Sequence, residues 1–153
     1  LENPELASHD EYAQKLNALF VRVEHMRKKF DVTKKKIKAL KSGLSYTQGQ
    51  PQELHQLVYN LREQQLALDK QINGSLAKKE IGEKDTPTLS NRLSVASRGF
   101  YRNTYGPTKM HMESFDMAVA LADALSVKVD ALAVNANAVV AKAVAAGAPV
   151  ILE

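Results

Sequence analysis

Apolar residues recur along this chain at alternating steps of four and three, the spacing of a narrow stripe on one face of a helix. The first seam of this kind begins at Tyr12 and continues for more than four heptads, interrupted only by Thr33. Similar patterns begin at Leu54, Leu89 and Phe115. Each of the four segments is therefore predicted to be a helix that buries one face.

Capping and stop signals set the limits of these helices. Ser8 stands three residues before Glu11, the spacing of a capping box, and Gly43 suits the left-handed residue that follows a helix. Gly74 offers one end for the second helix, although the apolar pattern continues beyond it. The predicted helices cover about residues 9–42, 51–78, 87–104 and 107–146.

Because short to medium connections join these helices, we expect an all-α fold: an antiparallel up-down-up-down four-helix bundle with a short third helix. The fourth helix is much longer than the third. We therefore expect it to overrun the end of the bundle at which the chain enters.

A chain of 153 residues with 44% apolar content is long enough for one domain with its own core, here residues 1–153. The absence of cysteine excludes disulfides, thiolate nucleophiles and cysteine-based zinc sites. No apolar run reaches the roughly 20 residues of a membrane-spanning helix. The ends of the chain suggest an excised C-terminal fragment of a larger protein, with residues 152–153 as a remnant of a tag.

The sequence offers little for catalysis or metal binding. Di-metal helical bundles use Glu-x-x-His, and none of His9, His25, His55 and His111 has a carboxylate three residues before it. His111 and Met112 could in principle ligate a haem, but a surface and core role explains them better. No serine stands in a glycine-flanked elbow. We therefore predict no catalytic, cofactor-binding or metal-binding residue, and no enzymatic activity for this chain.

The most prominent charged feature is a basic run between Arg27 and Lys41, with eight basic residues and one acid, Asp31. A solvated helix face is the simplest interpretation, because these residues fill positions between seam residues and no aromatic residues are interleaved for base stacking. A docking face for a protein, nucleic acid or anionic lipid is the alternative. The candidate interaction residues are Arg27, Lys28, Lys34, Lys35, Lys36, Lys38 and Lys41. A second candidate, an aromatic patch, consists of Tyr101 and Tyr105.

The order of the segments resembles the C-terminal helical region of bacterial sortilin-like proteins, β-propellers with neuraminidase (Asp-box) repeats that are described as glycosyl hydrolases. The resemblance rests on Asn3-Pro4 before the first helix, on "NRL" at 91–93, and on Pro107-Thr108 before the last helix. The acidic linker before the third helix is shorter here, and the last helix is unusually rich in alanine.

The resemblance implies a non-catalytic accessory module of a larger exported bacterial protein, periplasmic or extracellular, that braces or docks the adjacent propeller or a protein partner. It transfers no site residue, since any chemistry in that family belongs to the propeller. The alternative is an independent helical protein that uses the basic face at 27–41 to bind a polyanion or an acidic partner. Neither hypothesis involves a small-molecule substrate or a cofactor.

Overall fold

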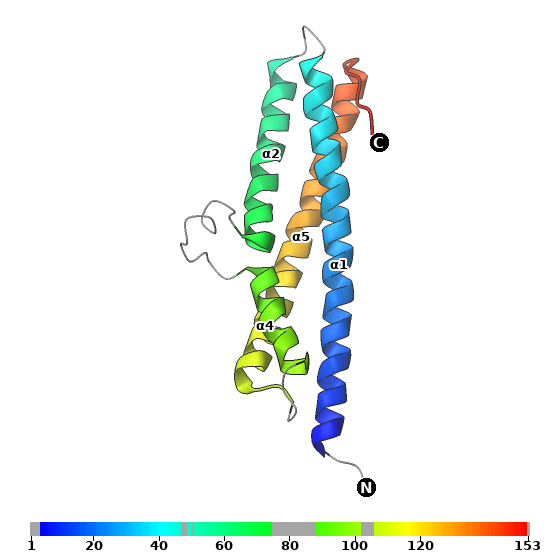
Figure 1. Cartoon of the computed structure of the whole chain (residues 1–153). Helices are drawn as coiled ribbons and strands as arrows, with labels where there is room; N and C mark the ends of the chain where they lie inside the picture. The colour runs from blue at the N-terminus through cyan, green and yellow to red at the C-terminus, as the bar shows by residue number, and fades with distance from the viewer. Residues whose placement is uncertain (1–3, 47–48, 50, 75–87, 102–105, 153) are drawn as a thin grey trace. The chain divides into compact units, whose positions relative to one another are not determined.

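The computed structural model describes residues 4–46, 49, 51–74, 88–101 and 106–152, with the backbone alone for 4–8 and 101. These residues contain four helices: α1 (Pro4–Ser45), α2 (Gln52–Asn73), α4 (Leu89–Tyr101) and α5 (Lys109–Ala145) (Figure 1). No strand occurs in the described segments, and the helices pack against one another. The prediction of an all-α protein with four helices and a short third helix is confirmed.

Helix α1 extends beyond its predicted limits at both ends. It begins at Pro4, whose fixed φ suits the first turn of a helix, so Ser8 lies inside α1 and is not its N-cap. Gly43 also lies inside α1, without a positive φ. A Cβ atom at Gly43 would lie 2.3 Å from the carbonyl oxygen of Pro149. This glycine therefore permits close packing and does not end the helix.

Helix α2 ends at Asn73, the earlier of the two ends that the sequence offers. Gly74 follows with a φ of 85°, and its N–H donates to the carbonyl of Lys70 at 2.8 Å. A residue without Cβ adopts this backbone conformation at little cost. Residues 75–78 of the predicted second helix and residues 87 and 102–104 of the predicted third helix lie outside the described residues.

The later helices have the ends that their sequences favour. Thr88 caps α4, since its Oγ1 accepts the N–H of Asn91 at 3.1 Å. Helix α5 ends in a Schellman motif: Gly147 has a φ of 86°, and the N–H of Ala148 donates to the carbonyl of Ala143 at 2.9 Å. Both ends of α5 fall within two residues of the prediction.

The chain divides into two compact units. Unit 1 comprises Leu1–His25 and Asp69–Leu125, and unit 2 comprises Met26–Leu68 and Ser126–Glu153. Helices α1 and α5 each contribute one segment to both units, whereas α4 belongs to unit 1 and most of α2 belongs to unit 2.

Aromatic side chains form one packed cluster in unit 1. The Tyr12 hydroxyl donates to the carbonyl of Ala96 at 2.6 Å, and the Tyr12 ring lies 5.7 Å from the ring of Phe115. Phe100 packs against this cluster, and its ring stacks on the His9 ring with the ring centres 4.9 Å apart. Burial raises the pKa of the Tyr12 phenol, because the phenolate would lose its hydration. This arrangement serves packing.

The core of unit 2 consists of predicted seam positions from three helices. Thr33, the polar interruption in the first seam, is 2% exposed, and its Oγ1 donates to the carbonyl of Lys29 at 2.9 Å. The hydroxyl is thus satisfied within its own helix. The apolar members are all at most 6% exposed: Met26, Phe30, Ile37, Leu40, Leu44, Leu54, Val58, Leu61, Leu68, Val129, Leu132, Ala136, Val139 and Ala143.

Polar contacts in unit 2 define the direction of α5 relative to α1. The Lys29 Nζ lies 2.6 Å from the Asp130 Oδ1, and the Lys36 Nζ donates to the Asn137 Oδ1 at 2.8 Å. The second contact lies seven residues after the first on both helices, so the two segments are parallel.

Unit 1 has the same relation between these helices. Tyr12 contacts Phe115, and ten residues further along α1, Arg22 forms an ion pair with Asp123. By contrast, α4 is antiparallel to α1, because Tyr12 contacts Ala96 whereas the earlier residue His9 contacts Phe100. The predicted up-down-up-down order is therefore wrong for the third and fourth helices. The connection at 74–88 is long enough that it need not reverse the chain.

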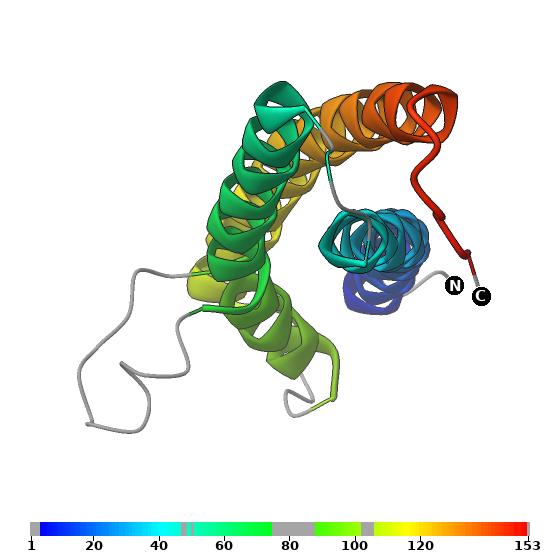
Figure 2. The ribbon, with the colours of Figure 1, turned by 90° about the horizontal axis from the view of Figure 1, so that it is seen from above.

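The parallel direction also changes where α5 ends. Residues 148–151, which follow the Schellman motif, pass alongside the C-terminal part of α1, as Figure 2 shows for the red segment. The Pro149 carbonyl packs over Gly43 in unit 2. The expected overrun at the end where the chain enters is therefore wrong, because it assumed an antiparallel last helix.

Candidate functional site

The basic run of α1 separates into two groups according to the neighbouring helix. One group faces α5 and is paired: Lys36 donates to Asn137, and Lys29 forms an ion pair with Asp130. Lys29 was not among the predicted interaction residues. Its position directly before the seam residue Phe30 could have indicated a pair with a neighbouring helix, since residues that flank a seam often form ion pairs between helices.

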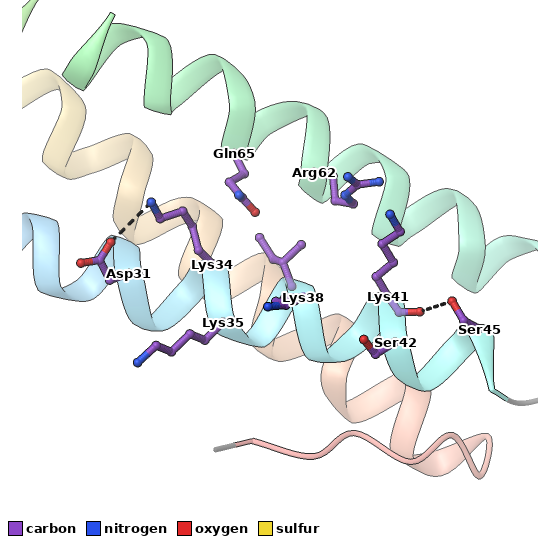
Figure 3. Close-up of a pocket in the computed structure, with 10 residues that line it drawn as sticks. Asp31, Lys34, Lys35, Lys38, Lys41, Ser42, Ser45, Arg62 and Gln65 are labelled. Carbon is purple, nitrogen blue, oxygen red and sulfur yellow. Dashed lines mark hydrogen bonds and ion pairs between the residues drawn. The ribbon is translucent and has the colours of Figure 1, made fainter. Parts of the chain in front are cut away.

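The other group lines a hollow between α1 and α2 in unit 2, which we call the α1–α2 hollow. It has a volume of about 650 Å³. Cations outnumber acids in its lining by five to one. The lining residues are Asp31, Lys34, Lys35, Ile37, Lys38, Lys41, Ser42, Ser45, Arg62 and Gln65 (Figure 3).

Among the described residues, Lys34 is the one cation of this hollow with an acidic partner. Its Nζ lies 3.5 Å from the Asp31 Oδ1 and 4.9 Å from the centre of the Phe30 ring. The pair is three residues apart on one helix and open to water, so it contributes little to stability.

Four cations of the hollow have no ion-pair partner among the described residues: Lys35, Lys38, Lys41 and Arg62. Arg62 extends from α2 toward the Lys41 side chain on α1, whereas Lys35 points away from α2 (Figure 3). Gln65 points from α2 toward α1. Two hydroxyl groups, from Ser42 and Ser45, complete the polar lining. The Ser45 hydroxyl donates to the carbonyl of Lys41 at 2.8 Å.

Arg62 was missed by sequence reasoning because the basic run was considered within one helix. Arg62 follows the seam residue Leu61, which is 3% exposed. A residue next to a seam position reaches toward a neighbouring helix. Pairing the second helix antiparallel to the first across their short connection would have pointed to this arginine.

A second hollow lies between α1 and the segment that follows α5, and we call it the α1–tail hollow. Its volume is about 620 Å³, and it shares Lys35, Lys38 and Ser42 with the α1–α2 hollow. The rest of its lining is largely apolar: Ala39, Gly43, Tyr46, Pro149 and Ile151. Tyr46 and Ile151 are 86% and 70% exposed, so this hollow has an apolar outer rim.

The remaining predicted site residues do not join these hollows. Arg27 and Lys28 make contacts of their own and line neither hollow. Of the predicted aromatic patch, Tyr105 lies outside the described residues, and only the backbone of Tyr101 is described.

Histidines and carboxylates do not gather within the described ranges. No group of three or more metal-ligating residue types occurs there. The His111 ring contacts Thr108 at the start of α5, with its Nδ1 3.1 Å from the Thr108 backbone nitrogen. A Cβ at Gly99 would lie 2.8 Å from the His111 side chain, so this ring fills a tight space beside α4. His111 therefore has a structural role at the first turn of α5.

None of the helices in the described segments is both long enough and apolar enough to span a membrane. Comparison with known proteins gave no match: no family model fits the chain, and no curated protein and no solved structure is detectably similar to it. The resemblance to sortilin-like proteins therefore stays a prediction.

Proposed function

We propose that this protein is a non-catalytic helical docking module that binds an acidic partner through the α1–α2 hollow. The observation that carries the proposal is the set of four cations, Lys35, Lys38, Lys41 and Arg62, that have no acidic partner among the described residues. The same helix pairs Lys29 with an acid on α5.

Electrostatics supports this assignment. Like charges that share a hollow repel one another, and a ligand of opposite charge removes this repulsion while it gains charge-assisted hydrogen bonds. Arg62 and Lys41 extend toward one another from different helices, so one carboxylate can bind both (Figure 3). Arginine and lysine donate protons in hydrogen bonds but accept none, which suits recognition of carboxylates or phosphates.

Polyanion binding tests the proposal. We expect labelled polyglutamate and heparin to bind the protein at low salt, with affinity that falls as salt rises. The variant Lys41→Glu/Arg62→Glu should lose about tenfold or more in affinity, equivalent to about 1.4 kcal/mol. The control Lys142→Glu changes an exposed lysine of α5 outside both hollows and should retain most of the affinity. Equal losses in both variants, or no binding at low salt, would contradict the proposal.

The family resemblance supports a wider context for this module: an accessory part of a larger exported bacterial protein. Of its motif residues, Pro4 begins α1, and Pro107 and Thr108 directly precede α5. Leu93, the last residue of the "NRL" motif, is buried in α4. An immunoblot of the source cells tests this context. A periplasmic or extracellular band much larger than 16.9 kDa is expected, and a band at that mass would contradict it.

A further inference from the structure

We propose that the occupant of the α1–α2 hollow is an acidic α-helix of a protein partner. This inference rests on the proposed docking function and adds the shape and the charge spacing of the partner. It favours a helix over nucleic acid and over a membrane surface.

The hollow has the form of a groove between two helices. Its α1 wall includes a stripe of residues at steps of three and four that runs along the helix axis: Asp31, Lys34, Lys38, Lys41 and Ser45. Lys35, Ile37 and Ser42 line the hollow beside this stripe. Its α2 wall carries Arg62 and Gln65, one turn apart. A third helix laid along such a groove packs its own side-chain rows between these two walls.

The cations along the groove match the repeat of a helix. Lys34, Lys38 and Lys41 occupy positions i, i+4 and i+7 of α1, which span about 10 Å at 1.5 Å per residue. Carboxylates at i, i+4 and i+7, or at i, i+3 and i+7, of a partner helix have the same axial spacing. Arg62 faces the Lys41 end of this row, where two cations converge. Asp31, paired with Lys34, discourages a fourth carboxylate at the other end.

The floor of the groove also suits a folded partner. Ile37 belongs to the lining although its side chain is only 1% exposed, so the bottom of the groove is apolar. The lysine walls add their aliphatic stems. A helix with a small apolar residue between its carboxylates fits such a floor.

Nucleic acid and membranes fit the groove less well. A duplex or a bilayer presents its charges over a broad surface, so it needs cations spread over a wider area than one groove. Here Lys41 and Arg62 point toward one another across the groove (Figure 3). No aromatic side chain among the described residues lines the α1–α2 hollow, so a single strand would find no stacking platform there.

Two peptides of identical composition test the proposal. One is a helix-forming peptide with glutamates at i, i+4 and i+7, and the other distributes the same glutamates around the helix. We expect the first to bind at least about tenfold more tightly, as measured by fluorescence anisotropy. Lys41→Gln/Arg62→Gln should reduce its affinity to that of the second peptide, whereas Lys142→Gln should not. Circular dichroism verifies that each variant is folded.

The outcomes separate this inference from the docking function itself. Equal binding of the two peptides, with polyglutamate still dependent on Lys41 and Arg62, overturns the helical occupant and leaves the docking function intact. Tighter binding of a short DNA duplex than of the matched peptide, lost in the same variant, also overturns it. Failure of every polyanion to bind overturns both proposals.

Discussion

The two flanks of α1 in unit 2 carry similar residues but use them differently. On the α5 flank, Lys29 and Lys36 meet Asp130 and Asn137, one heptad apart. On the α2 flank, Lys38 and Lys41 line one hollow together with Arg62, another cation. The first flank uses charge to orient two helices, and the second leaves it available to a ligand. The role of each basic residue in the run therefore depends on which helix it faces.

The largest expected loss of stability comes from changing Ile37, which lines the α1–α2 hollow and also belongs to the core. Ile37 is 1% exposed, and Ile37→Ala should lower the free energy of unfolding by about 2–5 kcal/mol because it leaves a cavity. Urea denaturation measures this loss. Val32 is 54% exposed on the same helix, and Val32→Ala should change stability by no more than about 0.5 kcal/mol. Similar losses in the two variants would show that the hollow is not built on the core.

A smaller effect is expected where the C-terminal segment packs on α1. In Gly43→Ala, the new Cβ would lie 2.3 Å from the Pro149 carbonyl oxygen. The clash should cost about 1–3 kcal/mol, which equals or exceeds the roughly 1 kcal/mol gained in helix propensity. Hydrogen exchange should accelerate at residues 148–151. Ser42→Ala provides a neighbouring control, and an increase in stability in Gly43→Ala would contradict the close packing.

Reversal of a single charge on the α5 flank should have a still smaller effect. Asp130→Lys places a second cation opposite Lys29 and should destabilise the protein by about 0.5–1 kcal/mol, as expected of an exposed pair. Lys29→Asp combined with Asp130→Lys restores opposite charges and should recover most of the loss. If the stability change of the double variant equals the sum of the changes in the two single variants, the pair has no interaction energy and does not orient the helices.

The smallest change should have the opposite sign. Arg62→Gln removes one of the converging cations on the α2 flank, so we expect stability to stay constant or rise by up to about 0.5 kcal/mol. Added salt should diminish the gain, because it screens the repulsion that the variant removes. Thermal unfolding at low and high salt measures both effects. Clear destabilisation by Arg62→Gln would mean that this arginine has an internal acidic partner.

The sequence was sufficient to predict the buried faces. Every apolar residue assigned to the first seam, from Tyr12 to Leu44, is at most 7% exposed, and Thr33 is buried with them. Hydrophobic spacing determines which face of a helix avoids water, and this holds whatever the neighbours are. The helix count and the short α4 followed from the same pattern and from the turn residues.

Hydrophobic spacing could not determine which helix lies against which. A seam of leucines and alanines packs equally well against a parallel or an antiparallel neighbour, so loop length alone gave the wrong direction for α5. The information lay in polar residues beside the seams, such as Lys29 before Phe30 and Asp130 after Val129. The basic candidates fared similarly: Lys35, Lys38 and Lys41 line the hollow, whereas Lys36 orients α5.

The contact between Gly43 and Pro149 has a consequence for sliding between α1 and α5. Two of the five α5 seam positions in unit 2, Ala136 and Ala143, are alanines one heptad apart, so after a slide by one heptad one small side chain would take the place of the other. Such a slide would even bring Asp130 opposite Lys36 in place of Asn137. It would also move Pro149 away from the only residue in the last turns of α1 without a Cβ. The close contact between Gly43 and Pro149 thus favours one register of α5 on α1.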